Sequence, residues 1–276
     1  MARKRNNNQG QQVTRHSNRK GGKRNKETVV QDRWEKKEEK GRVIKEKFEE
    51  SRKIAPLVAK TENQKIALKA LREKQLVILS KSAGTGKSEL CVWWACHQWL
   101  TGACDNIVIT RPDKGLGETY PVPGNDAAKI LTFLYPLLLK MKKYLGTGIL
   151  RNNLQLEDVD VLFKEAKGIQ IVSMAKLGGM SFSDKTIVIA DEVQSATIAQ
   201  VKALATRAEE GCQILITGDS TQTPIKGQEN GLDYLERKLK ENPHKEAQVV
   251  QFTPEDCCRY GISKHLTRVF EEDGTW

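Results

Sequence analysis

Short runs of apolar residues alternate with amphipathic stretches along this chain from residue 55 onward. Most runs are continuously apolar, which is typical of strands buried on both faces of a parallel sheet. Because parallel neighbours need a crossover connection, strands that alternate with helices predict an α/β domain. The expected strands are Leu76 to Ser80, Asn106 to Thr110, Ile169 to Ser173, Thr186 to Ala190, Gln213 to Thr217 and, more weakly, Gln248 to Phe252. The expected helices are residues 63 to 73, 87 to 100, 126 to 144, 196 to 209, 230 to 241 and 263 to 272.

The residues before this region follow a different pattern. Residues 33 to 53 interleave charges of both signs and offer few side chains for burial, which predicts a solvent-exposed helix. Nine of the 46 Lys and Arg residues lie within residues 1 to 26, where there is no acidic residue and almost nothing apolar. Such a composition predicts disorder. We therefore expect a disordered basic tail at residues 1 to 32, a charged helix or linker at 33 to 56, and one domain at 57 to 276.

The net charge of +11 comes largely from this tail, because the rest of the chain holds 37 basic and 35 acidic residues. A basic tail favours contact with the phosphate backbone of nucleic acid, and such contact weakens as salt increases. The alternative is a solvated tail without a partner. We expect RNA or single-stranded DNA as the partner.

Several classes of protein are disfavoured. The longest apolar stretch, Ile130 to Leu139, contains Thr132 and Pro136 and is shorter than the roughly 18 to 20 residues that cross a bilayer. The N-terminus is charged from Arg3 onward and lacks the apolar core of a secretory signal. The six cysteines form no CxxC pair and the four histidines are scattered, so we expect free thiols and no zinc site. The expected location is the cytoplasm, and no membrane contact is expected.

A phosphate-binding loop is predicted directly after the first strand. Residues 80 to 88 read Ser-Lys-Ser-Ala-Gly-Thr-Gly-Lys-Ser and lead into an apolar-periodic helix. Gly84 and Gly86 allow the backbone to wrap a phosphate, Lys87 can reach the β- and γ-phosphates, and Ser88 can bind Mg²⁺. The alternative is an ordinary glycine turn with a surface lysine. One position departs from the full pattern, because Lys81 stands where the first glycine is expected.

Two adjacent carboxylates, Asp191 and Glu192, end the strand at Thr186 to Ala190. We expect this strand to lie beside the strand of the phosphate-binding loop. Asp191 could then hold Mg²⁺ through water, and Glu192 could orient and deprotonate the attacking water. The alternative is that the pair caps the following helix. Together with the loop, the pair predicts Mg²⁺-dependent hydrolysis of ATP.

A third strand runs into Gly218-Asp219-Ser220-Thr221-Gln222. At a strand end this string suits a sensor in which Gln222 feels the γ-phosphate and passes the signal to the neighbouring loop. By itself the string is a turn. After a phosphate-binding loop and an Asp-Glu strand, it points to helicase-like ATPases.

Taken in order, these blocks resemble the PhoH family, the phosphate-starvation-inducible ATPases of bacteria and their phages. The core of that family is similar to the first RecA-like domain of superfamily 1 helicases. The resemblance covers about residues 57 to 271 and implies one RecA-like P-loop domain acting in a bacterial or phage-infected cell. The matching blocks are Thr61 to Gln64, Ala83 to Ser88, Thr110 to Pro112, Gly117-Glu118, Pro123-Gly124, Ala190 to Gln194, Lys202, Thr206-Arg207, Thr217 to Gln222 and Glu255 to Arg259.

The resemblance also implies roles for single residues. Gln64 would read adenine, Arg111 would belong to a loop near the nucleotide or the nucleic acid, and Arg259 would be an arginine finger for its own or a neighbouring subunit. The alternatives are a surface helix residue, the end of a strand and an ordinary surface cation. The expected catalytic residues are Lys87, Glu192, Gln222 and Arg259. The expected nucleotide-binding residues are Gln64, Ser82, Ala83, Gly84, Thr85, Gly86, Lys87, Ser88 and Glu89, and the expected Mg²⁺ ligands are Ser88 and Asp191.

The length of the chain bears on the mechanism. A superfamily 1 motor closes two RecA-like domains around ATP, whereas about 220 residues here leave space for one such domain. We therefore expect an ATPase that assembles into a homo-oligomer, a hexameric ring by resemblance, and that RNA or single-stranded nucleic acid stimulates. The alternative is a nucleotide-gated binding module with little hydrolysis. A small-molecule kinase ranks last, because the Asp-Glu and Gly-Asp-x-x-Gln strings activate water and sense phosphate.

Three tryptophans, Trp93, Trp94 and Trp99, lie on the helix that follows the phosphate-binding loop. They could stack on bases. Their helical spacing against a sheet favours packing in the core.

Overall fold

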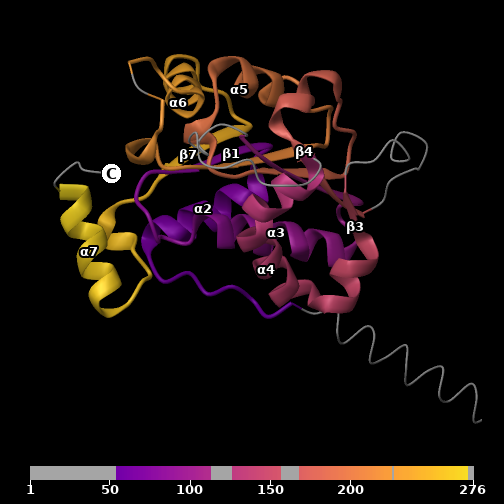
Figure 1. Cartoon of the computed structure of the whole chain (residues 1–276), viewed down its shortest axis with the longest axis horizontal. Helices are drawn as coiled ribbons and strands as arrows, with labels where there is room; N and C mark the ends of the chain where they lie inside the picture. Colours follow the sequence, from indigo (N-terminus) through magenta and orange to yellow (C-terminus); the bar gives the residue numbers. More distant parts are fainter. Residues whose placement is uncertain (1–53, 113–125, 157–167, 226, 273–276) are drawn as a thin grey trace, which may run out of the picture. The chain divides into compact units, whose positions relative to one another are not determined.

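The apolar runs of the sequence form a parallel β-sheet (Figure 1). The computed structural model describes residues 54–112, 126–156, 168–225 and 227–272, and within these residues the sheet has seven strands. Their order is β3, β4, β2, β5, β6, β1, β7, and every neighbouring pair is parallel. The strands are β1 (Leu76–Ser80), β2 (Asn106–Arg111), β3 (Leu154–Leu156), β4 (Gly168–Ser173), β5 (Thr186–Ala190), β6 (Gln213–Thr217) and β7 (Ala247–Gln251). The predicted tail and the predicted helix at 33 to 53 lie outside the described residues.

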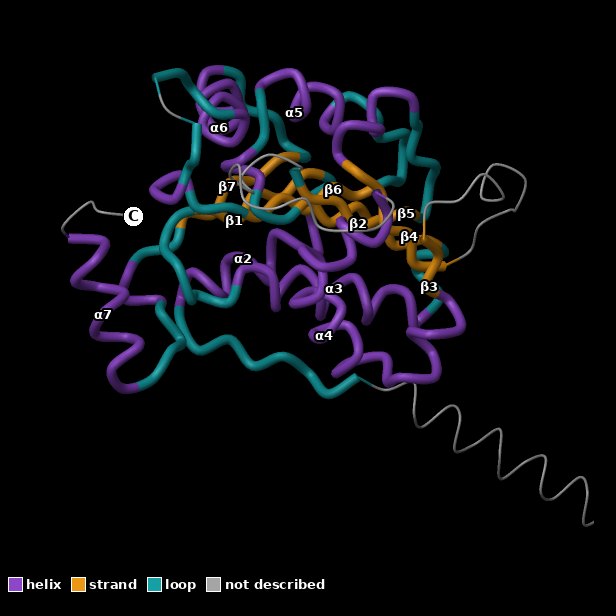
Figure 2. The backbone as a smooth tube through the Cα atoms, viewed as in Figure 1, coloured by secondary structure: helices purple, strands orange, loops and turns teal. Residues whose placement is uncertain are grey.

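Helices cover both faces of the sheet (Figure 2). Helices α2 (Glu62–Glu73), α3 (Lys87–Thr101) and α4 (Asp126–Asn153) lie on one face, and α5 (Ile198–Ala205) and α6 (Gly231–Glu241) lie on the other. In β1, Val77 and Leu79 pack with the first group of helices and Ile78 packs with the second. Burial on both faces explains why the strand sequences are apolar without alternation. The remaining helical elements are α7 (Gly261–Glu272) and the 3-10 turns η2 (Met174–Gly179), η3 (Val193–Ser195), η4 (Ser220–Gln222) and η5 (Pro254–Asp256).

The predicted fold class is confirmed, because the structure is an α/β domain with a parallel sheet flanked by helices. All six expected strands are present, with ends that differ by at most one residue. The strand that the sequence did not predict is β3 at the edge of the sheet, which has three residues. Such a short strand leaves no periodic pattern to detect.

Two predicted helix ends were wrong. Helix α4 continues to Asn153 rather than stopping at 144, and it is interrupted only at Gly146, whose backbone is non-helical (φ 76°, ψ 162°). Helix α5 ends at Ala205 rather than 209. The backbone of the expected last turn bonds Phe182 instead of continuing the helix. The Phe182 N–H donates to the Arg207 carbonyl (2.9 Å), and the Phe182 carbonyl accepts from Glu209 N–H (3.0 Å).

The structure also corrects the expected strand order. Strand β5, which precedes Asp191, does not lie beside β1, because β6 lies between them. Asp191 nevertheless reaches the phosphate-binding loop, because α3 starts at the end of that loop and packs against both β6 and β5. The inserted strand places Gly218 and Asp219 between the two halves of the predicted site.

The three tryptophans pack in or against the core, as the sequence predicted. Trp93 is buried and its Nε1–H donates to the Ala55 carbonyl (3.1 Å), while Trp94 Nε1–H donates to Gln213 Oε1 (2.7 Å). Trp94 and Trp99 pack, partly buried, against the same core cluster. All six cysteines are free thiols. Among the described residues, no helix is long and apolar enough to cross a membrane, and no group of three or more His, Cys, Asp or Glu side chains could hold a metal ion.

Candidate functional site

The phosphate-binding loop lies at the carboxyl end of β1 and turns directly into α3. Its path needs several positive φ angles, at Lys81 (67°), Gly84 (71°) and Gly86 (88°). Lys81 occupies the position where the sequence pattern expects glycine, so the structure explains that preference: a side chain in this region costs about 1 kcal/mol. The loop keeps its turn despite the departure. The loop therefore has the backbone turn that a phosphate cradle needs.

The ammonium of Lys87 lies within this loop. Lys87 Nζ donates to the Ser82 carbonyl (2.6 Å) and to the Lys81 carbonyl. Thr85 Oγ1 also donates to the Ser82 carbonyl (3.2 Å), which ties the loop across its width. A lysine held by carbonyl oxygens is placed to exchange them for phosphate oxygens.

A carboxylate and two hydroxyl groups meet beside the loop. Ser88 Oγ, from the first turn of α3, donates to Asp191 Oδ1 (2.8 Å), and Thr217 Oγ1, from the end of β6, donates to the same oxygen. Asp191 and Thr217 are buried. Hydroxyl and carboxylate oxygens are the ligands that Mg²⁺ prefers, so the donor set fits the ion predicted at Ser88 and Asp191.

Glu192 is connected to the end of β6 through a buried glutamine. Gln194 Nε2 donates to Glu192 Oε2 (2.6 Å), and Gln194 Oε1 accepts from Asp219 N–H (3.0 Å). Asp219 Oδ2 in turn accepts from Gln222 Nε2 (3.0 Å). These four residues form a hydrogen-bonded chain from the predicted base to the predicted sensor, so a shift of Gln222 can be transmitted to Glu192. The backbone of Glu192 is left-handed (φ 57°), a conformation that is strained for this residue.

This chain needs glycine at position 218. A Cβ at Gly218 would lie 2.8 Å from Gln194 Oε1 and 2.7 Å from Leu232 Cδ2. The close approach of the backbone is what lets Asp219 N–H reach Gln194. Sequence reasoning included Gln194 in a matching block but did not assign it to the site, because spacing alone does not show which way a side chain turns.

Gln64 connects the loop to the C-terminal part of the domain. Its Nε2 donates to the Thr85 carbonyl (2.9 Å) and to Cys258 Sγ (3.1 Å), and its Oε1 accepts from Lys60 N–H (2.8 Å). With 6% of its surface exposed, Gln64 is not a surface helix residue, so that alternative was wrong. Its predicted role at adenine stays a prediction.

Arg259 reaches the loop within the same chain. Cys258 N–H donates to the Gly84 carbonyl (2.9 Å), and a Cβ built on Gly84 would lie 2.8 Å from Arg259 Nε. Arg259 Nη1 donates to Thr267 Oγ1 of α7 (3.0 Å), and Thr267 is buried. The guanidinium is therefore held by α7 over the glycine of the loop. Arg259 itself is exposed, and its role as an arginine finger stays a prediction.

These groups surround one cavity of about 370 Å³, which we call the phosphate cavity. It brings together all four predicted catalytic residues and most of the predicted nucleotide-binding residues. Gln64 and Ser82 lie behind the loop and do not line it. The lining residues are Ala83, Gly84, Thr85, Gly86, Lys87, Ser88, Glu89, Lys140, Asp191, Glu192, Thr217, Gly218, Asp219, Gln222 and Arg259.

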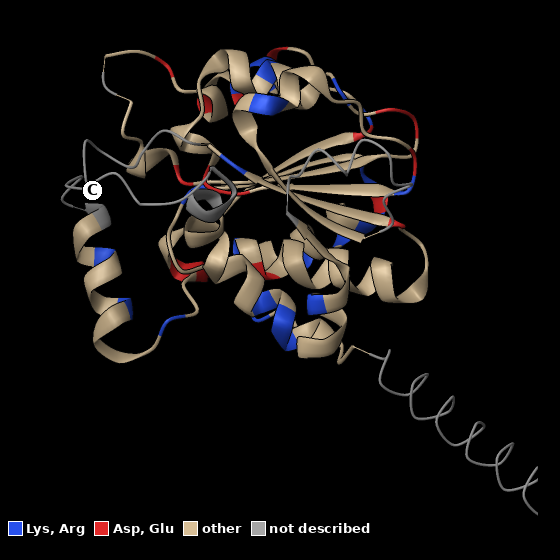
Figure 3. Ribbon diagram, turned by 45° about the vertical axis from the view of Figure 1, so that its right-hand side comes forward, with Lys and Arg blue, Asp and Glu red and all other residues tan. Residues whose placement is uncertain are grey.

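Glu89 is paired with α4. Its Oε1 accepts from Lys143 Nζ (2.6 Å) and from the Tyr144 hydroxyl. Burial alone would raise the pKa of Glu89, but the hydrogen bonds from Lys143 and Tyr144 hold that pKa below its usual value. Burial and the bond to Glu89 raise the pKa of Tyr144 to about 12. The bonds from Lys143 and Tyr144 hold α4 against the first turn of α3. Helix α4 is one of the helices below the sheet that carry basic segments in Figure 3.

Arg111 ends β2 and is not part of the phosphate cavity. Its Nη1 donates to the Phe133 carbonyl of α4 (3.0 Å). The loop that follows it, residues 113–125, lies outside the described residues, so the predicted role of Arg111 near a nucleotide or nucleic acid stays a prediction.

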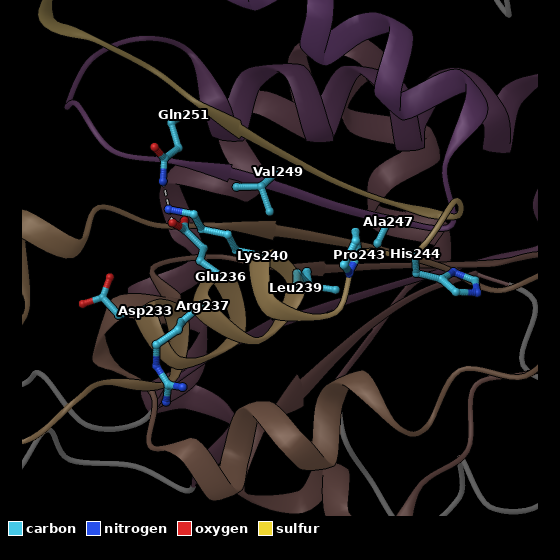
Figure 4. A pocket seen from close by; sticks show the side chains of 10 residues that line it. All are labelled: Asp233, Glu236, Arg237, Leu239, Lys240, Pro243, His244, Ala247, Val249 and Gln251. Carbon is cyan, nitrogen blue, oxygen red and sulfur yellow. Dashed lines mark hydrogen bonds between the residues drawn. The ribbon is translucent and has the colours of Figure 1, made fainter.

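A second cavity of about 730 Å³ lies between α6 and the edge strand β7 (Figure 4). Its rim is charged, with Asp233, Arg237 and Lys240, and a hydrogen bond between Gln251 Nε2 and Glu236 Oε2 (2.7 Å) crosses it. It contains no predicted site residue. We therefore place the chemistry at the smaller phosphate cavity.

Comparison with known proteins adds to this geometry. A family model described as PhoH-like protein matches residues 56–271. Protein PhoH from Escherichia coli (strain K12) is 30% identical over 227 residues, which cover 80% of this chain and 60% of that protein. The PhoH-like protein from Bacillus subtilis (strain 168) is 31% identical over 200 residues, covering 72% of this chain and 59% of that protein. The chain thus matches less than two thirds of the length of these relatives.

Solved structures give more distant likenesses. The large terminase from a thermophilic bacteriophage has a TM-score of 0.47 and 12% identity, over 76% of this chain and 49% of that chain. The Hef helicase domain from Pyrococcus furiosus has a TM-score of 0.42 and 11% identity, over 70% of this chain and 39% of that chain.

Proposed function

The chain belongs to the PhoH-like protein family of P-loop NTPases, and from this premise we propose that it is an Mg²⁺-dependent ATP hydrolase. The single observation that carries the proposal is the convergence of Ser88 and Thr217 on one carboxylate oxygen of Asp191 beside the phosphate-binding loop. If Asp191 only capped the helix that follows β5, it would not need to bond hydroxyl groups from α3 and β6. Mg²⁺ bound there would neutralise charge between the β- and γ-phosphates of ATP.

Other residues of the phosphate cavity would bind the phosphates, activate the water and sense the γ-phosphate. Lys87 leaves the loop carbonyls and binds phosphate oxygens, while the N–H groups of the loop and of the first turn of α3 hold the β-phosphate. Glu192 accepts the proton of the attacking water, and Gln194 fixes the orientation of its carboxylate. Gln222, bonded to Asp219, lies where it can sense the loss of the terminal phosphate.

Arg259 would stabilise the transition-state charge from within its own subunit. Its support is the contact with Gly84 and the hydrogen bond to Thr267, which hold the guanidinium at the rim of the phosphate cavity. A cation already in place needs no neighbouring subunit to complete the chemistry. Assembly would then act on the site by positioning Arg259, not by supplying the cation.

The partners are a further part of the proposal. The nine cations among residues 1 to 26 support binding to RNA or single-stranded DNA, because phosphate backbones attract such a tail. Self-association, for which we propose a ring of six, is supported by exposed apolar side chains on and beside α7: Tyr260 is 81% exposed and Ile262 is 68% exposed. Under this proposal a neighbouring subunit would contact α7, and α7 would in turn position Arg259 through Thr267.

The second candidate is a nucleotide-gated binding module with little hydrolysis. The observation that favours it is that both key charges are engaged inside the chain, Lys87 by carbonyl oxygens and Glu192 by Gln194. Binding of ATP would then release these contacts and change the affinity for a partner.

The two candidates are separated by steady-state ATP hydrolysis at several protein concentrations, with and without single-stranded RNA. For a hydrolase we expect turnover that RNA stimulates and that both Lys87→Ala and Glu192→Gln abolish. A rise of specific activity with protein concentration would support self-association of the chain into the active oligomer. Tight ATP binding with negligible turnover under every condition would overturn the hydrolase and favour the gated module.

A further inference from the structure

One residue of the phosphate cavity comes from a part of the chain that the sequence motifs do not include. Most of the lining residues belong to the phosphate-binding loop with the start of α3, to the loops after β5 and β6, or to the segment that carries Arg259. The exception among the described residues is Lys140, on α4. A third cation therefore faces the same space as Lys87 and Arg259.

The position of Lys140 is fixed on two sides of its helix. Leu137 and Met141 are fully buried in the core, and Lys143 and Tyr144 bind Glu89 at the start of α3. Residues three and four apart lie on one face of a helix, so Lys140 lies on the same face as this pair, one turn earlier. The backbone of the half-buried Lys140 is therefore fixed at the wall of the cavity.

The sheet order shows which end of the nucleotide Lys140 approaches. Helix α4 packs against β2 and β4, which lie beyond β5, whereas Arg259 follows β7 at the opposite edge of the sheet. Asp191 and Glu192, which we assign to Mg²⁺ and to the attacking water, follow β5. The terminal phosphate must face these two carboxylates, so Lys140 approaches it from the side of β2 and β4, and Arg259 from the side of β7.

The charge of Lys140 is available for an anion. Within the part of the chain that the structure describes, Lys140 forms no salt bridge, in contrast to Lys143. It acts on Glu89 at longer range, where it contributes to the lowered pKa of that carboxyl. The cavity holds the carboxylates of Glu89, Asp191, Glu192 and Asp219. Lys140 adds to the positive charge of Lys87 and Arg259, which offsets these carboxylates when a triphosphate binds.

We propose that Lys140 contacts the γ-phosphate of a bound nucleoside triphosphate and makes the site prefer triphosphate over diphosphate. The inference rests on the proposed function, because it takes the β-phosphate to be held by the phosphate-binding loop. Lys140 is then a specificity-determining residue that enters from α4. When the γ-phosphate leaves, α4 loses its contact with the nucleotide while its pairing with Glu89 remains.

The test compares the affinities of the full chain for ADP and for a non-hydrolysable ATP analogue, both with Mg²⁺, at constant ionic strength. A hydrogen bond between charged groups is worth about 1.5–3 kcal/mol, so Lys140→Gln should weaken the ATP analogue about 10- to 150-fold. The affinity for ADP should change less than about twofold, because ADP lacks the contacted phosphate. Lys140→Arg should restore part of the preference.

The matched control is Lys142→Gln, which removes an exposed lysine two residues away on the same helix. It should leave both affinities unchanged, which controls for the loss of general positive charge. Equal weakening of ADP and the ATP analogue by Lys140→Gln would overturn the inference, because Lys140 would then only balance Glu89. Unchanged affinities would overturn it too. A wild-type protein that binds neither nucleotide would instead refute the proposed function on which the inference rests.

Discussion

Gln194 is the residue whose removal should separate positioning from nucleotide binding most clearly. It donates to Glu192 Oε2 (2.6 Å) and accepts from Asp219 N–H (3.0 Å), and 2% of its surface is exposed. Gln194→Leu keeps the approximate size of the side chain and removes both bonds. Losing a hydrogen bond to a charged group costs about 1.5–3 kcal/mol, so kcat should fall about 10- to 150-fold if the oriented Glu192 is the base. KM for ATP should change little, because Gln194 does not line the phosphate cavity.

The variant should also lose stability, because Asp219 N–H is left buried without an acceptor, at a cost of about 1–3 kcal/mol. Gln213→Leu controls for that loss. Gln213 Nε2 donates to the carbonyls of Leu71 (2.8 Å) and Lys74 (2.7 Å), away from the phosphate cavity. The Gln213→Leu variant should have a lower free energy of unfolding, measured by urea denaturation, and an unchanged kcat. A folded Gln194→Leu protein whose kcat stays within about twofold of wild type would refute the assigned role.

Two further predictions concern the metal and the acid limit of stability. Thr217→Val removes the hydroxyl that bonds Asp191, so the Mg²⁺ concentration for half-maximal hydrolysis should rise about 10- to 100-fold. An unchanged Mg²⁺ titration would show that Thr217 does not orient Asp191 for the ion. The pKa of Glu89 is below its ordinary value of 4.5 in the folded protein, so its ionised form stabilises the fold above that pH, and this stability is lost as pH falls below it. Glu89→Gln, which cannot ionise, should therefore flatten the dependence of unfolding free energy on pH below about 4.5, and an unchanged slope would show that Lys143 and Tyr144 do not favour the ionised carboxylate.

The parts of the fold that were predictable are those set by neighbouring residues in the chain. A run such as Thr186 to Ala190 is apolar because both of its faces are covered, and the glycines after β1 are needed by positive φ angles. These constraints act over fewer than about ten residues, so they leave a pattern in the sequence. The strands, the phosphate-binding loop and the Asp-Glu pair were found for this reason.

The parts that were not predictable depend on which distant segments become neighbours. The position of β6 between β1 and β5 follows from the topology of the whole sheet, and no local pattern records it. Lys140 lies about midway along an otherwise apolar-periodic helix and looks like an ordinary solvent-facing lysine. Gln194 acquires its role only because Gly218 lets another strand end approach it. Tertiary placement, rather than residue type, makes these three positions part of the site.

The position of β1 in the sheet has a consequence for the order in which the protein is made. Its two neighbours, β6 and β7, are encoded after it, and so is Cys258, whose N–H binds the carbonyl of Gly84. On a translating ribosome, the apolar β1 therefore emerges long before either of its edges can be paired. A nascent chain carries the phosphate-binding loop early but lacks the structure that surrounds it. The nucleotide site is completed only after β6, β7 and the segment with Cys258 have been made, so a chain that terminates before them retains the motif without its binding site.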